Sequence, residues 1–380
     1  MHLKIRTTSD LENLALKRGW IENPAEKRAV LLPNIPIYSF NFQENFLEKE
    51  FVTAKSPSTV NIKEPVIVAG SNFGLIYKDY FFPFGFSHSP NWLGINYQMV
   101  KKDLINFSIS NSNKLNMTGS SVSLLGTTNH WGHFFVDAMD RLNALLNHDK
   151  KILITDKNFF GFNAKVDEYG IVPQSTEIIK ALGYTLQINN LVPVSANNYY
   201  YIDDLEAICL LSEKPAISAE TFIRVRSHLM KSFQELGSGD SSRKRFLYVG
   251  RSGQAKRTVK DEQDLEIIVK NNGGEVVKLG EEPLHRVVKT FSNVDAIIIV
   301  IGSAKFNLIF CKPGTKVLLV IPVGYRAGVL TMVRHICVAL ELDLSVYEVP
   351  ILTRSNFLLN SNLLISSANF NHMLQILFKS

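Results

Sequence analysis

The segment 129–142, NHWGHFFVDAMDRL, contains the side chains best suited to acid–base chemistry. We predict a helix over 131–146, on which His133, Asp137 and Arg141 recur every four residues and therefore line one face. A carboxylate beside a histidine fixes the imidazole tautomer and stabilises the protonated ring, so such a pair can act as a general base. His133 and Asp137 are therefore the candidate catalytic residues, and the spacing leaves open which of them takes the proton.

Two other interpretations of this segment stay open. In the first, it is an ordinary helix start in which Asp137 and Arg141 form an ion pair. In the second, His130, His133 and Asp137 converge on a zinc ion in a metal-dependent hydrolase. The HExxH pattern is absent and no other cluster supplies a clear further ligand, so we expect no metal.

A concentration of positive charge surrounds the end of a predicted strand at 245–250. The basic residues there are Arg243, Lys244, Arg245, Arg251, Lys256, Arg257 and Lys260. Arg251 directly follows the strand, and its planar guanidinium matches phosphate oxygens. The loop is neither a GxGxxG nor a Walker sequence, and a solvated basic loop would have a similar composition. We predict that Arg251, Lys256 and Arg257 bind a phosphate-bearing ligand.

Further phosphate donors are predicted where the apolar strand 294–301 gives way to a helix. The strand stops at Gly302, and Ser303 is the expected N-cap of the helix that follows. Exposed N–H groups at a helix start attract phosphate, and Lys305 and Asn307 add side-chain donors. The alternative is a tight strand–helix joint without a ligand.

From residue 245 the sequence alternates apolar runs with amphipathic segments. Strands are expected at 245–250, 275–280, 294–302, 316–322 and 343–350, and helices at 262–271, 283–291, 304–310 and 329–340. Aliphatic strands that alternate with helices are typical of parallel βαβ units covered on both faces. The second half is therefore predicted to be Rossmann-like, with ligands at the carboxyl ends of its strands.

The first half is also α/β but less regular. It contains predicted strands at 66–77 (two, around a turn), 121–126 and 151–156, and helices at 131–146, 174–182 and 215–236. The polar stretch GSGDSSRKR after residue 236 is the clearest linker. We predict an N-terminal domain over 1–236 and a C-terminal domain over 237–380, which ends in helices.

Composition and charge exclude several classes of protein. The chain has 380 residues, of which 46% are hydrophobic and 20% charged, so it is neither disordered nor fibrous. Three widely spaced cysteines indicate reduced thiols and a cytoplasmic compartment. We expect no signal peptide, and no apolar run approaches the ~20 residues that span a bilayer, so any membrane association is peripheral. The net charge of +6 suits an anionic ligand, and no nucleic-acid-binding motif is present.

Three segments, taken in order, resemble glycosyltransferase family 61, which includes bacterial capsular-polysaccharide enzymes. The segment 133–142 is similar to the family's asparagine-tyrosine-glycine-histidine, which leads into an aspartate and then proline-arginine-leucine. Gly250 and Arg251, with Arg257, resemble its serine-arginine strand end and the arginine that follows. The segment 307–315 resembles its asparagine-leucine-leucine-phenylalanine and proline-glycine-threonine.

The chain also departs from the family pattern, as a divergent member would. Asp140 stands where the family has a proline before the arginine. Ile301 stands at the histidine of the family's histidine-glycine-alanine-glycine-leucine. Lys305 offers a replacement for the positive charge lost at Ile301.

The resemblance implies an activity and a fold. The fold is of the GT-B type, with two Rossmann-like domains that face a central cleft. The activity is an inverting, metal-independent transfer of a hexose or pentose from a nucleotide-sugar donor to a glycan or lipid-linked glycan acceptor in surface or capsular polysaccharide synthesis. It needs no cofactor besides the donor. A non-catalytic nucleotide-sugar-binding relative is the alternative.

The same resemblance assigns roles to the two predicted domains. Domain 1–236 would bind the acceptor, in contact with His130, Trp131 and Arg141. Domain 237–380 would bind the donor through the predicted phosphate-binding residues, namely Arg251, Lys256, Arg257, Gly302, Ser303, Lys305 and Asn307.

Overall fold

The computed structural model describes residues 4–5, 8–23, 27–55, 58–69, 74–82, 114–117, 122–126, 134–135, 151–155, 173–181, 191–194, 198–210, 219–234, 244–251, 257–279, 282–325, 328–353 and 361–378. The chain divides into two compact units. Unit 1 comprises Met1–Arg28 and Thr53–Thr221, and unit 2 comprises Ala29–Val52 and Phe222–Ser380. Unit 2 is therefore built from two stretches that are far apart in the sequence.

Unit 1 contains two mixed six-stranded sheets. The first has the order β1 (Lys4–Ile5), β10 (Tyr80–Phe82), β9 (Gly74–Tyr77), β8 (Val66–Ala69), β15 (Tyr199–Ile202) and β11 (Lys114–Asn116). The second has the order β14 (Leu191–Val194), β13 (Lys151–Thr155), β12 (Val122–Gly126), β16 (Leu205–Leu210), β7 (Ser58–Ile62) and β2 (Ile21–Asn23). The described helices of this unit are α1 (Thr8–Arg18) and α5 (Pro173–Ala181).

These elements confirm the α/β class and the two strands predicted at 66–77, which are β8 and β9 and pair antiparallel. In the second sheet β14, β13, β12 and β16 are parallel, whereas β7 pairs antiparallel to β16 and β2 pairs antiparallel to β7. A second Rossmann-like domain and the GT-B arrangement stay predictions.

Unit 2 is built on one seven-stranded sheet. Its order is β18 (Glu275–Val277), β17 (Lys244–Val249), β19 (Val294–Val300), β20 (Lys316–Pro322), β21 (Asp343–Val349), β4 (Ile35–Ser39) and β5 (Glu44–Leu47). The five strands from β18 to β21 are all parallel, as the apolar runs predicted. Strand β4 continues the sheet in parallel to β21, and β5 returns antiparallel to β4.

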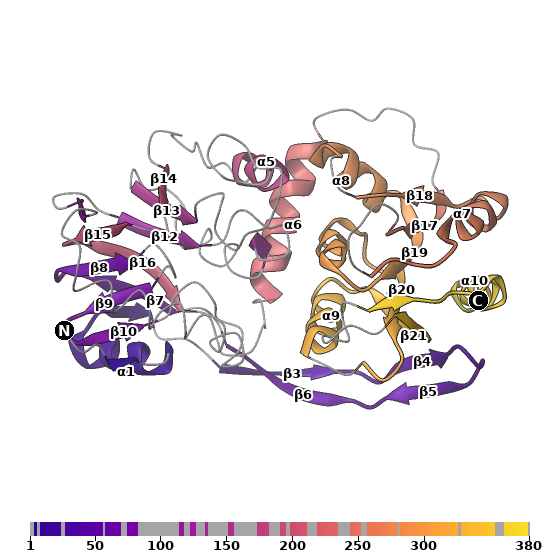
Figure 1. Ribbon diagram of the computed structural model, residues 1–380, viewed down its shortest axis with the longest axis horizontal. Coiled ribbons are helices and arrows are strands. Elements are labelled where there is room, and N and C mark those ends of the chain that lie inside the picture. Colours follow the sequence, from indigo (N-terminus) through magenta and orange to yellow (C-terminus); the bar gives the residue numbers. More distant parts are fainter. Residues whose placement is uncertain are drawn as a thin grey trace. The chain divides into compact units, whose positions relative to one another are not determined.

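Helices cover both faces of this sheet (Figure 1). The helices that the structure describes in unit 2 are α7 (Glu262–Asn271), α8 (Leu284–Ser292), η5 (Ser303–Phe310, a 3-10 helix), α9 (Gly328–Ala339), α10 (Ser367–Phe378) and most of α6 (Ala219–Gln234), which is not one of those that cover the sheet. Leu265 of α7 and Met373 of α10 join the core on one face, against Tyr248 and Ile298 of the central strands. Two short strands, β22 (Ile351–Thr353) and β23 (Asn362–Leu363), pair with each other.

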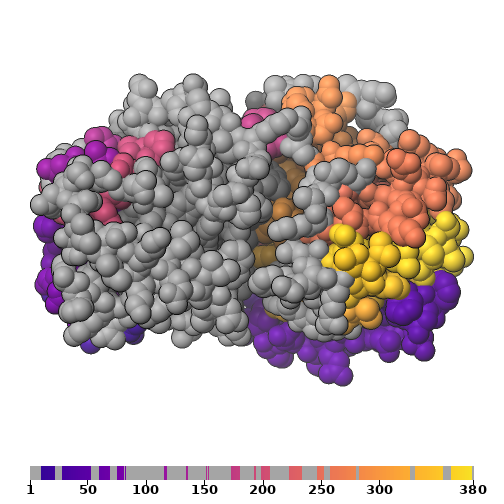
Figure 2. All heavy atoms as spheres, in the orientation of Figure 1, coloured from indigo at the N-terminus to yellow at the C-terminus, as the bar shows by residue number. Residues whose placement is uncertain are grey.

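The segment 29–52 belongs to unit 2 by its contacts rather than by its place in the sequence. Strands β3 (Lys27–Leu32) and β6 (Glu50–Lys55), which pair with each other, flank the hairpin of β4 and β5. Ile35 and Ile37 of β4 are buried in the core. The Asn369 side chain of α10 donates a hydrogen bond to the Phe40 carbonyl at 2.7 Å. Figure 2 shows this segment, in indigo, against the orange and yellow surface of unit 2.

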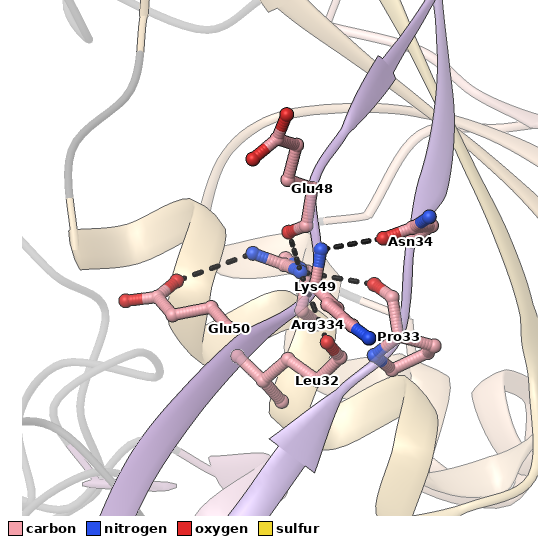
Figure 3. Close-up of polar contacts among 7 residues, drawn as sticks. All are labelled: Leu32, Pro33, Asn34, Glu48, Lys49, Glu50 and Arg334. Carbon is pink, nitrogen blue, oxygen red and sulfur yellow. Dashed lines mark hydrogen bonds and ion pairs between the residues drawn. The ribbon is translucent and has the colours of Figure 1, made fainter.

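Arg334 of α9 binds the segment 29–52 at the residues that flank the hairpin of β4 and β5 (Figure 3). Its Nη2 donates to the carbonyls of Pro33 and Glu48, each at 2.9 Å, and also to that of Leu32 at 3.4 Å. Its Nη1 lies 3.2 Å from the Glu50 carboxylate. Only 2% of Arg334 is exposed, so these oxygens replace water around a buried charge.

Candidate functional site

The sheet of unit 2 has one point at which its strand order reverses. The chain passes from β17 outward to β18 and then back across β17 to β19, after which it continues through β20 and β21. In open α/β sheets, ligands bind outside the carboxyl ends of the strands at such a reversal. Arg251 lies just beyond β17, and Gly302 lies just beyond β19. The topology therefore places these two residues, which the sequence singled out, at one edge of the sheet.

Two guanidinium groups close over Gly302. A Cβ atom at this position would lie 3.1 Å from Nη1 of Arg251 and 3.3 Å from Nη1 of Arg257. Only a residue without a side chain lets both cations approach this backbone undisturbed. Arg257 has a positive φ of 60°, and its buried Nε has no hydrogen-bond partner among the described residues.

Partial burial of Arg251 and Arg257 lowers the pKa of both guanidinium groups. Burial, and then the charge of Arg257, lowers the pKa of Arg251 to about 10. Burial also lowers the pKa of Arg257. Both groups still carry a full charge near neutral pH. Two like charges held together away from water favour an anion that can neutralise them.

Glu262, the first residue of α7, holds the end of β17 in place. Its Oε1 accepts hydrogen bonds from the Tyr248 hydroxyl and from the Arg251 backbone N–H, both at 2.7 Å. The neighbouring Gly250 N–H donates to the Val277 carbonyl at 2.9 Å. Glu262 is 5% exposed. The turn that presents Arg251 is thus fixed by a buried carboxylate.

Lys305 adds a third cation beside Gly302. Its Nζ lies 3.2 Å from the Gly302 carbonyl and 4.2 Å from the centre of the Phe306 ring. Burial, reinforced by the charge of Arg257, lowers the pKa of Lys305 to about 7. The ammonium group is therefore only partly protonated at neutral pH, and an anion near Gly302 would favour its charged form.

The structure thus brings together four of the predicted phosphate-binding residues, namely Arg251, Arg257, Gly302 and Lys305. Ser303 is adjacent, but it is the first residue of the 3-10 helix, and its predicted capping role is wrong because Gly302 occupies the N-cap position without a side chain. The Asn307 amide is buried and donates to the Ala304 carbonyl at 3.0 Å, inside the helix.

The residues predicted for the acceptor side and for catalysis are not among those that the structure describes. His130, Trp131, His133, Asp137 and Arg141 lie outside the described residues, as does Lys256 of the basic loop. Phe134 and Phe135, which follow His133, are described and fully buried, with ring centres 5.8 Å apart.

Sequence reasoning missed two residues of this site, Glu262 and Tyr325. Glu262 begins a predicted helix directly after the basic loop, and this position is the signal that could have found it. Tyr325 follows the strand next to β19 and is 5% exposed. The charge of Arg257 lowers the pKa of Tyr325 only because the folded sheet brings the two residues near each other. No pattern in the sequence indicates this proximity.

Comparison with known proteins connects this site to a family. The family model described as Glycosyltransferase 61 matches residues 131–318, a range that contains the predicted helix 131–146 and the four clustered residues. No curated protein matches the chain. Within the described parts of the chain, no three His, Cys, Asp or Glu side chains gather as a metal site, and no helix is long and apolar enough to cross a membrane.

Proposed function

Because the chain belongs to glycosyltransferase family 61, we propose that it uses a nucleotide-sugar donor and that unit 2 binds the donor's diphosphate. The main support is the closure of Arg251 and Arg257 over Gly302, at the edge of the sheet where ligands bind. Guanidinium groups match phosphate oxygens in shape and charge. A diphosphate would neutralise the positive charge of these two partly buried arginines.

The positive charge of the two arginines matters most at the step in which the bond between the sugar and the diphosphate breaks. The acceptor hydroxyl attacks the anomeric carbon from the side opposite the diphosphate, a base takes the hydroxyl proton, and the bond between the sugar and the phosphate oxygen breaks with inversion. The electron pair of that bond leaves with the diphosphate. Preorganised cations at this oxygen stabilise the transition state, so Arg251 and Arg257 can fill the role that a divalent metal has in other transferases.

We assign the base to His133, with Asp137 as the group that orients it, and the acceptor contacts to His130, Trp131 and Arg141. An imidazole with a reference pKa of about 6.5 accepts a proton readily near neutral pH, whereas an aspartate at about 3.9 is a weak base. The proposed acceptor is a glycan or lipid-linked glycan of a surface or capsular polysaccharide, to which the donor adds a hexose or a pentose. A GT-B arrangement, with the enzyme at the cytoplasmic side of a membrane, suits this role.

The donor proposal is tested by binding. A thermal-shift panel of nucleoside diphosphates first identifies the nucleotide, and calorimetry then measures its affinity. Arg251→Ala is expected to weaken binding by about 10–150-fold, the range for a hydrogen bond to a charged group. Arg286→Ala is the control, because this arginine is 70% exposed on α8 of the same unit. Equal affinity of the Arg251 variant and the wild type would contradict the proposal.

The base assignment is tested by turnover at saturating donor. His133→Ala should lose about 10²–10⁴-fold in rate and keep its donor affinity, because general-base catalysis contributes about that factor. If instead Asp137→Asn is inactive but folded while His133→Ala remains active, the two roles are reversed. If both variants keep their activity, the segment 129–142 is structural.

A second candidate, a relative that binds the donor without catalysis, is favoured by Ile301. The resemblance places the family's histidine at this position, where Ile301 is fully buried and its backbone N–H donates to the Val320 carbonyl at 2.9 Å. An apolar side chain there donates nothing to a leaving group. Donor binding without product formation, over a panel of acceptors, would favour this candidate.

A further inference from the structure

We propose that Tyr325 is a further donor-binding residue, whose hydroxyl donates a hydrogen bond to the phosphate group held by Arg257. The inference rests on the proposed function of the same site. Tyr325 lies beyond residue 318, where the family match ends, so the match assigns it no role.

The sheet places Tyr325 at the same edge as Gly302. Strand β20 pairs directly with β19. Val300, the last residue of β19, pairs with Val320, and β20 continues for two more residues to Pro322. The chain turns immediately after β20, where the Tyr325 N–H donates to the Pro322 carbonyl at 3.1 Å. Tyr325 therefore lies one strand away from the glycine over which the arginines close.

The turn that presents Tyr325 is held by the next strand along the sheet. The Gly324 N–H donates to Oε1 of the buried Glu348 at 3.1 Å, and the Val323 N–H donates to the Val349 carbonyl at 2.9 Å. Gly324 has a φ of 76°, a conformation that favours glycine. Two hydrogen bonds to β21 thus fix the turn before Tyr325, and a fixed turn suits a preorganised binding group.

The electrostatic setting suits a hydrogen-bond donor. Burial raises the pKa of Tyr325 to about 12, while the nearby positive charge of Arg257 offsets part of this rise. The phenol therefore stays protonated at physiological pH and can donate. Ionised phosphate oxygens accept hydrogen bonds but donate none. A protonated phenol near a guanidinium therefore complements them.

The probe is inorganic pyrophosphate, which shares the diphosphate chemistry of every candidate donor. Calorimetry compares the wild-type protein with Tyr325→Phe and with Tyr347→Phe. Tyr347 is the matched control, because it is also buried in this sheet and its hydroxyl lies 3.1 Å from Nδ1 of His372, in a separate contact. We expect Tyr325→Phe to weaken pyrophosphate binding by about 3–20-fold and Tyr347→Phe to leave it unchanged.

A double-variant cycle distinguishes a ligand contact from general packing. When Arg257→Gln is already present, Tyr325→Phe should weaken binding by a smaller factor, because both side chains act on one phosphate. Equal affinity of wild type and Tyr325→Phe overturns the proposal. Should Tyr325→Phe not fold, Tyr325→His, which keeps an N–H donor, is compared with Tyr325→Leu. Tighter binding by the histidine variant then supports the proposal, and equal binding overturns it.

Different results would overturn the donor site as a whole and the role of Tyr325 alone. A wild-type protein that binds neither pyrophosphate nor any nucleoside diphosphate would overturn the donor proposal and the role of Tyr325 together. A wild-type protein that binds pyrophosphate as tightly as Tyr325→Phe would overturn the role of Tyr325 alone.

Discussion

Lys305 makes the stability of unit 2 depend on pH. In the unfolded chain a lysine has a pKa of about 10.4, whereas burial beside Arg257 lowers it to about 7 in the folded protein. Between these two values the unfolded chain binds a proton that the folded protein does not, so stability rises with pH across this window. Below pH 7 both states are protonated and the full cost of burying the charge is present.

We therefore expect Lys305→Met, which keeps the length of the side chain, to stabilise the protein at low pH. The gain in the free energy of unfolding should be roughly 1–4 kcal/mol at pH 6.5 and should shrink as the pH approaches 10. Urea denaturation at three pH values measures it. The control is Lys312→Met, at an exposed position of the same unit, which should change little at any pH. A gain that stays constant with pH would show that the charge of Lys305 is not its cause.

The sequence predicts part of this site because strand ends can be recognised locally. Arg251 and Gly302 each follow an apolar run, and the ends of parallel strands meet at one edge. Glu262 and Tyr325 act through interactions made only after folding. The Glu262 carboxylate turns back to β17, and the neighbouring strand brings the Tyr325 phenol close enough for the charge of Arg257 to lower its pKa. The spacing of residues along the chain does not contain these contacts.

Among the elements, the hairpin of β4 and β5 is contacted by Arg334 on both of its sides, at the Pro33 and Glu48 carbonyls. Replacing Arg334 by methionine leaves the carbonyls of Leu32, Pro33 and Glu48 without this donor. We expect Arg334→Met to lower the free energy of unfolding by about 2–4 kcal/mol, because buried oxygens lose a charged partner. Chemical denaturation measures the loss, and hydrogen exchange should locate the increased opening in the segment 29–52.

Arg286→Met is the matched comparison. Its ion pair with Glu282 is 3.8 Å long and exposed, and such pairs contribute less than about 1 kcal/mol. Similar losses for the two variants would show that the contacts of Arg334 do not hold the segment.

Elements with long, regular patterns were predicted well. The helix predicted at 262–271 coincides with α7, and the strand predicted at 316–322 coincides with β20. Strands β4 and β5 have five and four residues, too few for a periodic signal, and β4 finds its partner β21 about 300 residues later in the chain. Pairing over such a separation leaves no local trace in the sequence.

At the scale of the whole molecule, the same contrast separates the two units. The parallel sheet of unit 2 grows mainly from consecutive βαβ steps, each of which the sequence shows. The sheets of unit 1 join strands from distant places, such as β7 with β16 and β8 with β15. Its mixed pairing follows from contacts that hydrophobic patterns do not specify.

Because unit 2 consists of two separate stretches of the chain, its parts are synthesised at different times on the ribosome. Leu32 and Arg334 are 302 residues apart in the sequence. At a synthesis rate of about 5–20 residues per second, roughly 15–60 seconds pass between them. During this time Ile35 and Ile37 are already made, but the strand and the arginine that bury them are not. Unit 1, whose last residue is Thr221, is fully synthesised first. At that point the hairpin of β4 and β5 exists, but the other strands of its sheet have not yet been made.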